Sequence, residues 1–129
     1  MSYQNLKNLP VYRQALELRT MSREIASFVT YNKDLLTLCK SNSLRDHIAD
    51  SILTDAILIP QQIARAERTT SALIRQRCIQ FINVMTQNLT SYCTGLEKDG
   101  VREREYLDLL RHELKHFRRV FKIWRRNLI

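Results

Sequence analysis

The feature that most constrains the fold of this chain is an uninterrupted apolar seam late in the sequence. Between residues 105 and 128, large apolar side chains recur at alternating intervals of three and four residues: Leu107, Leu110, Leu114, Phe117, Phe121, Trp124 and Leu128. This spacing places all of them on one side of an α-helix, where they can meet neighbouring helices. We therefore predict a long amphipathic helix over residues 105–128.

The outer face of this predicted helix is strongly basic. Residues 111–129 hold a single acid, Glu113, and seven cations: Arg111, Lys115, Arg118, Arg119, Lys122, Arg125 and Arg126. Solvated helix faces usually mix both signs, because oppositely charged i,i+4 pairs form and repulsion is avoided. The excess of one sign therefore predicts an anionic partner. The formal net charge of +8 and the pI near 9.8 favour nucleic acid or an anionic membrane over an acidic small molecule.

Three earlier stretches also show helical periodicity. Pro10 is placed to open a helix over residues 11–30, and apolar residues recur at helical spacing over 48–63 and 73–92. Gly95 is expected to stop the third of these helices. The second helix could begin near Asp34 or near Leu44, and the sequence leaves both starts open.

These stretches predict the fold class. No segment alternates apolar and polar residues as a half-buried strand would, and two Gly and two Pro leave few turns. The sequence predicts an all-α, antiparallel, up-down-up-down four-helix bundle, with residues 1–129 forming a single domain.

Some apolar residues fall outside the predicted core stripes. They are Leu109, Val120 and Ile123 on the last helix and Leu53 and Leu58 on the second. Such residues are candidates for a subunit interface, so we expect a homo-oligomer.

Residues 112–116 spell H-E-x-x-H, the pattern in which two histidines of a zinc peptidase bind the metal and the glutamate acts as general base. Leu114 belongs to the seam, which should turn His112 and His116 towards water. No His, Asp or Glu follows His116, and the surrounding cations oppose a divalent metal. We therefore expect no metal site, no catalytic residues and no cofactor.

Cellular location is predicted from two further observations. No apolar run approaches the ~20 residues of a membrane span, and the first ten residues lack the apolar core of a signal peptide. Cys39, Cys78 and Cys93 have no metal-like spacing and are expected to be reduced thiols. The sequence thus favours a cytoplasmic protein without a membrane partner.

Short motifs resemble a known family. Residues 8–18 (NLPVYRQALEL) are similar to the opening of the bacterial four-helix-bundle proteins first noticed in intervening sequences of ribosomal RNA genes, and residues 59–64 (IPQQIA) resemble their Ile-Pro-x-x-Ile-Ala motif. Residues 64–66 with Arg68, 106–107 and 124–125 look more like the accessory variability determinant of diversity-generating retroelements. Arg65 and Glu67 stand where the ribosomal branch usually has small and glycine residues after the Ile-Ala, and Ile123 stands where a glycine is expected just before the tryptophan, so the branch of the family stays open.

The accessory-protein branch implies a basic homopentameric barrel that binds the retroelement's reverse transcriptase and its template RNA. Together with the basic helix, the resemblance leads us to expect a non-enzymatic accessory protein that binds RNA or DNA. We expect the binding residues to be Arg65, Arg68, Arg75, Arg111, Lys115, Arg118, Arg119, Lys122, Arg125 and Arg126. The alternative is a structural or protein-binding bundle of the ribosomal intervening-sequence type, without a retroelement role.

Overall fold

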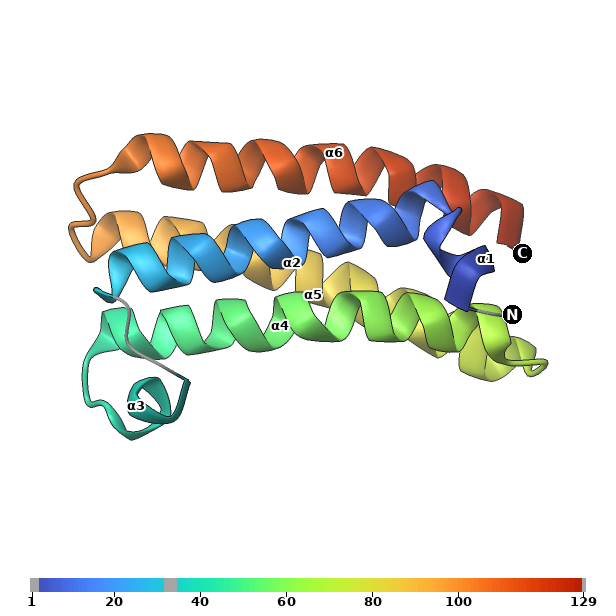
Figure 1. The fold of residues 1–129 in the computed structure, drawn as a ribbon, viewed down its shortest axis with the longest axis horizontal. Coiled ribbons are helices and arrows are strands. Elements are labelled where there is room, and N and C mark those ends of the chain that lie inside the picture. Colours follow the sequence, from blue (N-terminus) through green and yellow to red (C-terminus); the bar gives the residue numbers. More distant parts are fainter. Residues whose placement is uncertain (1–2, 32–34, 129) are drawn as a thin grey trace.

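The computed structural model describes residues 3–31 and 35–128, and these residues form helices and no strand (Figure 1). The helices are α1 (Tyr3–Lys7), α2 (Pro10–Val29), α3 (Leu35–Lys40), α4 (Leu44–Arg68), α5 (Ala72–Lys98) and α6 (Arg104–Leu128). The predicted all-α class is confirmed. The short helix α1 was not expected, because it is too short to show a periodic apolar pattern. Helix α3 occupies the stretch after residue 34, where the start of the second helix was left open.

Local chemistry sets where the long helices begin. Pro10 occupies the first turn of α2, where its missing N–H costs nothing. The hydroxyls of Ser43 and Ser71 cap α4 and α5 by accepting from the backbone N–H groups of Asp46 and Ile74. The long second helix therefore begins at Leu44. The alternative start at Asp34 lies outside the described residues.

The expected helix stop at Gly95 is wrong. Helix α5 continues through Gly95 to Lys98, and the turn is made at Gly100, whose φ of 90° suits glycine. A Cβ at Gly95 would come within 3.1 Å of the Ile48 side chain on α4. Gly95 is therefore suited to close packing of α5 against α4 rather than to ending the helix.

The four long helices lie side by side (Figure 1). Helix α6 packs against α2 and α5, and α4 packs against the same two helices, so α4 and α6 occupy opposite corners. The apolar seam forms much of the core, since its residues from Leu107 to Trp124 are buried. The indole N–H of Trp124 donates to Glu67 Oε1 at 2.8 Å and thereby joins α6 to the end of α4.

The residues outside the predicted stripes divide into two groups. Leu53, Leu58 and Val120 pack against the core, so they are less available to a partner than expected. Leu109 and Ile123 are exposed by 53% and 59%. None of the described helices combines the length and apolar character that crossing a lipid bilayer requires.

Candidate nucleic-acid interface

The cations of α6 are held in place by the burial of its seam. Because Phe117, Phe121 and Trp124 face the core, the residues between them point outwards or along the edges of the helix. Five cations repeat at intervals of four and three residues and form what we call the cation row: Arg111, Lys115, Arg118, Lys122 and Arg125. Arg119 and Arg126 are exposed beside this row.

The first member of the cation row contacts α5 directly. The two terminal nitrogens of Arg111 each lie 3.3 Å from an oxygen of Glu97, and Nη1 also lies 3.0 Å from Asp108 Oδ1. The hydrogen bonds with Glu97 are the main cause of the raised pKa of Arg111. This pair shows that the row lies on the side of α6 next to α5.

Glu97 in turn belongs to a stripe on α5. Counting back from it at alternating intervals of three and four residues gives side chains that are all polar and uncharged. We call these the polar row: Thr94, Thr90, Gln87, Asn83, Gln80 and Gln76. All of them are exposed except Asn83, which is half-buried. Since they share a helix face with Glu97, they lie on the side of α5 next to α6.

The two rows run alongside each other. Helix α6 returns along α5 after the short connection that follows Lys98 (Figure 1). Arg125 lies about four turns beyond Arg111, and Asn83 lies about four turns before Glu97. The ion pair between Arg111 and Glu97 therefore aligns the two rows along the helix axes. Glu97 is the only acid in α5, so this surface is free of carboxylates between Ala72 and Leu96.

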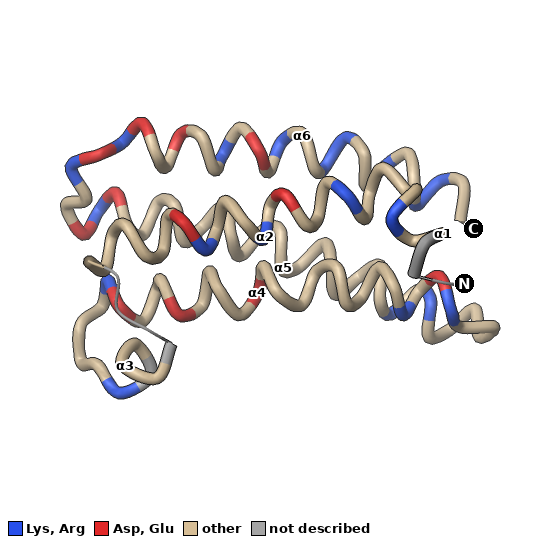
Figure 2. The backbone as a smooth tube through the Cα atoms, viewed as in Figure 1, with Lys and Arg blue, Asp and Glu red and all other residues tan. Residues whose placement is uncertain are grey.

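Helix α6 is divided along its length by charge (Figure 2). The half that follows the turn from α5 carries both signs, three acids and three cations, whereas the charged residues in the half that approaches the end of the chain are all Lys or Arg. Arg125 also lies over the ring of Phe121, with its guanidinium carbon 5.7 Å from the centroid. Apart from Arg111, the members of the cation row form no salt bridge with the described residues.

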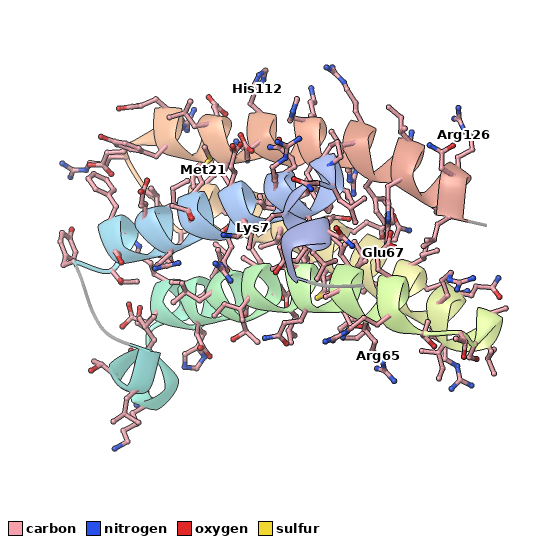
Figure 3. The ribbon with its side chains drawn as sticks, turned by 45° about the vertical axis from the view of Figure 1, so that its right-hand side comes forward. Lys7, Met21, Arg65, Glu67, His112 and Arg126 are labelled. Atoms are coloured by element: carbon pink, nitrogen blue, oxygen red, sulfur yellow. The ribbon has the colours of Figure 1, made fainter. Side chains whose placement is uncertain are left out.

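The cations predicted at the turn between α4 and α5 lie apart from this row. Figure 3 shows Arg65 and Arg126 on opposite sides of the molecule, in agreement with the opposite corners that α4 and α6 occupy. Arg75 donates to the backbone carbonyls of Thr69 at 2.9 Å and Ala66 at 3.5 Å, so its guanidinium closes the turn. Arg65 and Arg68 are exposed.

Arg65 borders a cavity of about 290 Å³ between α4 and α5. Arg77, which is not among the predicted binding residues, and Phe81 also line this cavity. The polar row was likewise not predicted, although its regular spacing and the lack of acids in α5 are visible in the sequence. Uncharged amides add nothing to a charge pattern, so this row does not stand out beside the arginines and lysines of α6.

The opposite edge of α6 meets α2 and has a different composition. Glu113 accepts a hydrogen bond from the Gln14 amide of α2. Three glutamates, Glu17, Glu24 and Glu113, line a cavity of about 390 Å³ between these helices. The edge of α6 next to α2 is thus acidic where the edge next to α5 is basic.

The H-E-x-x-H pattern does not assemble a metal site within the described residues. Leu114 is buried, and His112 and His116 are exposed, which confirms the predicted orientation (Figure 3). The Glu113 carboxylate is engaged by Gln14. The described part of the chain contains no group of three or more His, Cys, Asp or Glu side chains arranged to hold a metal ion.

Cys93 and Asp55 also have shifted pKa values. Burial raises the pKa of the Cys93 thiol to about 11, so this residue is an inert thiol rather than a nucleophile. Cys78 and Cys93 are both free and buried, in agreement with the prediction of reduced thiols, while Cys39 lies outside the described side chains. Burial also raises the pKa of Asp55, although hydrogen bonds with Tyr92 and Asn88 oppose this.

Comparison of the chain with protein-family models, curated proteins and solved structures found no match. Function is therefore inferred from the geometry and charge of the surface where α5 and α6 meet.

Proposed function

We propose that this protein is a non-enzymatic accessory protein that binds RNA or DNA through the α5–α6 surface. The observation that carries the proposal is the cation row beside a stretch of α5 that has no acid. A nearby carboxylate would neutralise the row or repel phosphates. Its absence leaves the positive charge available to a polyanion.

The binding mechanism is electrostatic. Each lysine or arginine that contacts a phosphate releases condensed counterions, which supplies affinity without reading the sequence. Lys115, Lys122 and Arg125 are exposed along the row, with Arg119 and Arg126 beside it. Arg65 and Arg68 present a second, smaller group of cations at the α4–α5 turn.

The decisive test removes charge from α6 and keeps the helix. Five substitutions to Gln, at Arg118, Arg119, Lys122, Arg125 and Arg126, retain much of the side-chain length and the helix propensity. Affinity for a labelled RNA should fall steeply. The slope of log affinity against log salt should shrink by about 0.7 to 0.9 for each phosphate that the variant no longer neutralises.

A matched control removes the same number of charges elsewhere. Exposed cations outside the α5–α6 surface are Lys7, Arg13, Arg23, Lys40 and Arg102. Their replacement by Gln should leave most of the affinity in place. Equal affinity and equal salt slope for wild type and the α6 variant would refute the proposal, as would equal losses in the variant and the control.

The finer architecture and the partners are part of the same proposal. The connections at alternate ends in Figure 1 support an up-down-up-down bundle. Exposed Leu109 and Ile123 support assembly into a barrel-like homo-oligomer. The resemblance to the accessory variability determinant suggests a homopentamer, with a reverse transcriptase and its template RNA as partners, in the cytoplasm.

The alternative function is a structural or protein-binding bundle without a retroelement role. Exposed apolar residues such as Phe81, Val84 and Leu73 on α5 support it, because such side chains commonly cover protein interfaces. Light scattering should give a mass several times 15.3 kDa. If the protein is a monomer and binds RNA, the proposed barrel-like homo-oligomer is wrong. If it is an oligomer and does not bind RNA, the alternative function is favoured.

A further inference from the structure

The side chains of the polar row can form hydrogen bonds that phosphate binding does not require. Three glutamines, one asparagine and two threonines occupy it, without an intervening charge. Carboxamides and hydroxyls both donate and accept hydrogen bonds, as the edges of nucleic-acid bases do. Helical repeat proteins that read RNA use side chains on helix surfaces in this way.

The position of the polar row beside the cation row suggests how a nucleic-acid strand would lie on the protein. Packed helix axes are about 8–10 Å apart, so neighbouring parts of one nucleotide can reach both rows. In an A-form RNA duplex the bases are paired and the major groove is too deep and narrow for side chains, so the polar row would reach few base edges. In a single strand the bases are free to turn towards one side.

We propose that single-stranded nucleic acid lies along the α5–α6 surface, with its phosphates on the cation row and its unpaired bases hydrogen-bonded to the polar row. This inference rests on the proposed function and narrows it to one class of ligand. It also distinguishes the roles of the helices, because α6 supplies affinity and α5 supplies the preference for unpaired bases.

The dimensions of the two rows are compatible with this arrangement. From Gln76 to Thr94 the polar row extends for about 27 Å at the rise of an α-helix. The cation row from Arg111 to Arg125 covers about 21 Å by the same measure. The ion pair between Arg111 and Glu97 marks the end at which both rows meet carboxylates, Glu97 itself and Asp108. A strand would therefore extend from this pair towards the cationic end of α6.

The test changes the polar row and leaves every charge in place. Gln80 and Gln87 are exposed and seven residues apart, so both can be replaced by Ala, the strongest helix former. The probes are a short single-stranded RNA of mixed sequence and the same strand annealed to its complement. Wild type should bind the single strand more tightly than the duplex.

The variant with Gln80→Ala and Gln87→Ala should bind the single strand on the order of tenfold more weakly than wild type. Its affinity for the duplex and its salt slope should match wild type, because every cation that neutralises a phosphate is retained. The control carries Thr54→Ala and Gln61→Ala, which are likewise exposed and seven residues apart, but on α4. This control should behave as wild type with both probes.

The outcomes separate this inference from the proposed function. Single-strand binding that is unchanged in the Gln80 and Gln87 variant, or a wild type that favours the duplex, overturns the inference and leaves the proposed function standing. A change in oligomeric mass in this variant alone would also overturn it, since the polar row would then be an interface between copies. If wild type binds neither probe, both proposals fall.

Discussion

The two edges of α6 share one helix and one buried seam, yet they present opposite surfaces. Along α5, cations stand beside uncharged amides and hydroxyls. Along α2, three glutamates line a cavity, and one of them, Glu113 of α6, accepts a hydrogen bond from Gln14. The neighbouring helix therefore decides what a cationic helix can bind. A row of arginines next to α2 would be partly neutralised, whereas next to α5 it remains available.

The change with the largest expected effect truncates one large side chain of the seam that both edges share. Phe117 is fully buried and stacks on Phe121 with ring centroids 5.9 Å apart. Phe117→Ala should lower the free energy of unfolding by about 3–5 kcal/mol, because it leaves a cavity in the core. Chemical denaturation followed by circular dichroism measures the loss. A change below ~1 kcal/mol would mean that the seam is not the common support of the two surfaces.

The second change makes the α5 side resemble the α2 side. Gln80→Glu with Gln87→Glu places two carboxylates beside the cation row. Affinity for RNA should fall by roughly tenfold or more, because two cations are neutralised in place. Thr54→Glu with Gln61→Glu adds the same charge to α4 and should cost much less. Similar losses in the two variants would show that total charge, rather than the neighbouring helix, controls binding.

A third change concerns the contact between α4 and α5, where the carboxylate of Asp55 on α4 is partly buried. Burial raises the pKa of Asp55, so the folded state favours its protonated form. One of its oxygens is buried without a hydrogen-bond partner among the described residues. The stability that the protonated form contributes is therefore present at low pH and is lost as pH rises through the folded-state pKa.

The corresponding measurement compares wild type with Asp55→Asn across pH. The free energy of unfolding of wild type, relative to the variant, should decrease as pH rises above the ordinary aspartate value of 3.8. The effect should be smaller than the two before it, because Asp55 is only half-buried and keeps hydrogen bonds with Tyr92 and Asn88. A constant difference across this range would contradict the raised pKa.

A smaller effect is expected from releasing the one paired member of the cation row. Glu97→Gln removes one of the two carboxylate partners of Arg111 and the only carboxylate of α5, and leaves Asp108 in place. Affinity for RNA should rise by a few-fold, and the salt slope should steepen by at most about 0.9, the value for one additional neutralised phosphate. No gain would indicate that Asp108 alone keeps Arg111 occupied.

The smallest effect is expected on the other edge of α6. Glu17→Gln with Glu24→Gln removes two exposed carboxylates of α2 that line the cavity between α2 and α6. RNA affinity at physiological salt should stay within about twofold of wild type, because exposed charges more than ~8 Å away are largely screened. A rise as large as that from Glu97→Gln would extend the binding surface to the α2 side.

The sequence predicted the elements well where apolar spacing was long and regular. The seam from Leu107 to Trp124 is buried as expected, and α2 begins and ends within one residue of its predicted bounds. The prediction failed at Gly95, because a glycine that permits close helix packing looks the same in sequence as one that ends a helix. Contact with Ile48 on another helix distinguishes the two cases, and only the fold supplies it.

Only part of the candidate site could be predicted, again because contacts between helices are not visible in the sequence. The cations of α6 were visible because charge is a local property of the sequence. Which of them are already engaged depends on tertiary contacts, as with Arg111 on Glu97 and Arg75 on the Thr69 carbonyl. The separation of Arg65 from Arg126 follows from the corners that their helices occupy, and spacing along the chain does not specify it.

Trp124 gives the molecule a built-in optical reporter. It is the only tryptophan in the chain, its indole is hydrogen-bonded to Glu67, and it precedes Arg125 directly. A strand that settles on Arg125 would change the electric field at the indole, and unfolding would expose the ring to water. Emission from one unlabelled residue can therefore follow both ligand binding and the integrity of the bundle, and Glu67→Gln should shift its baseline without removing the signal.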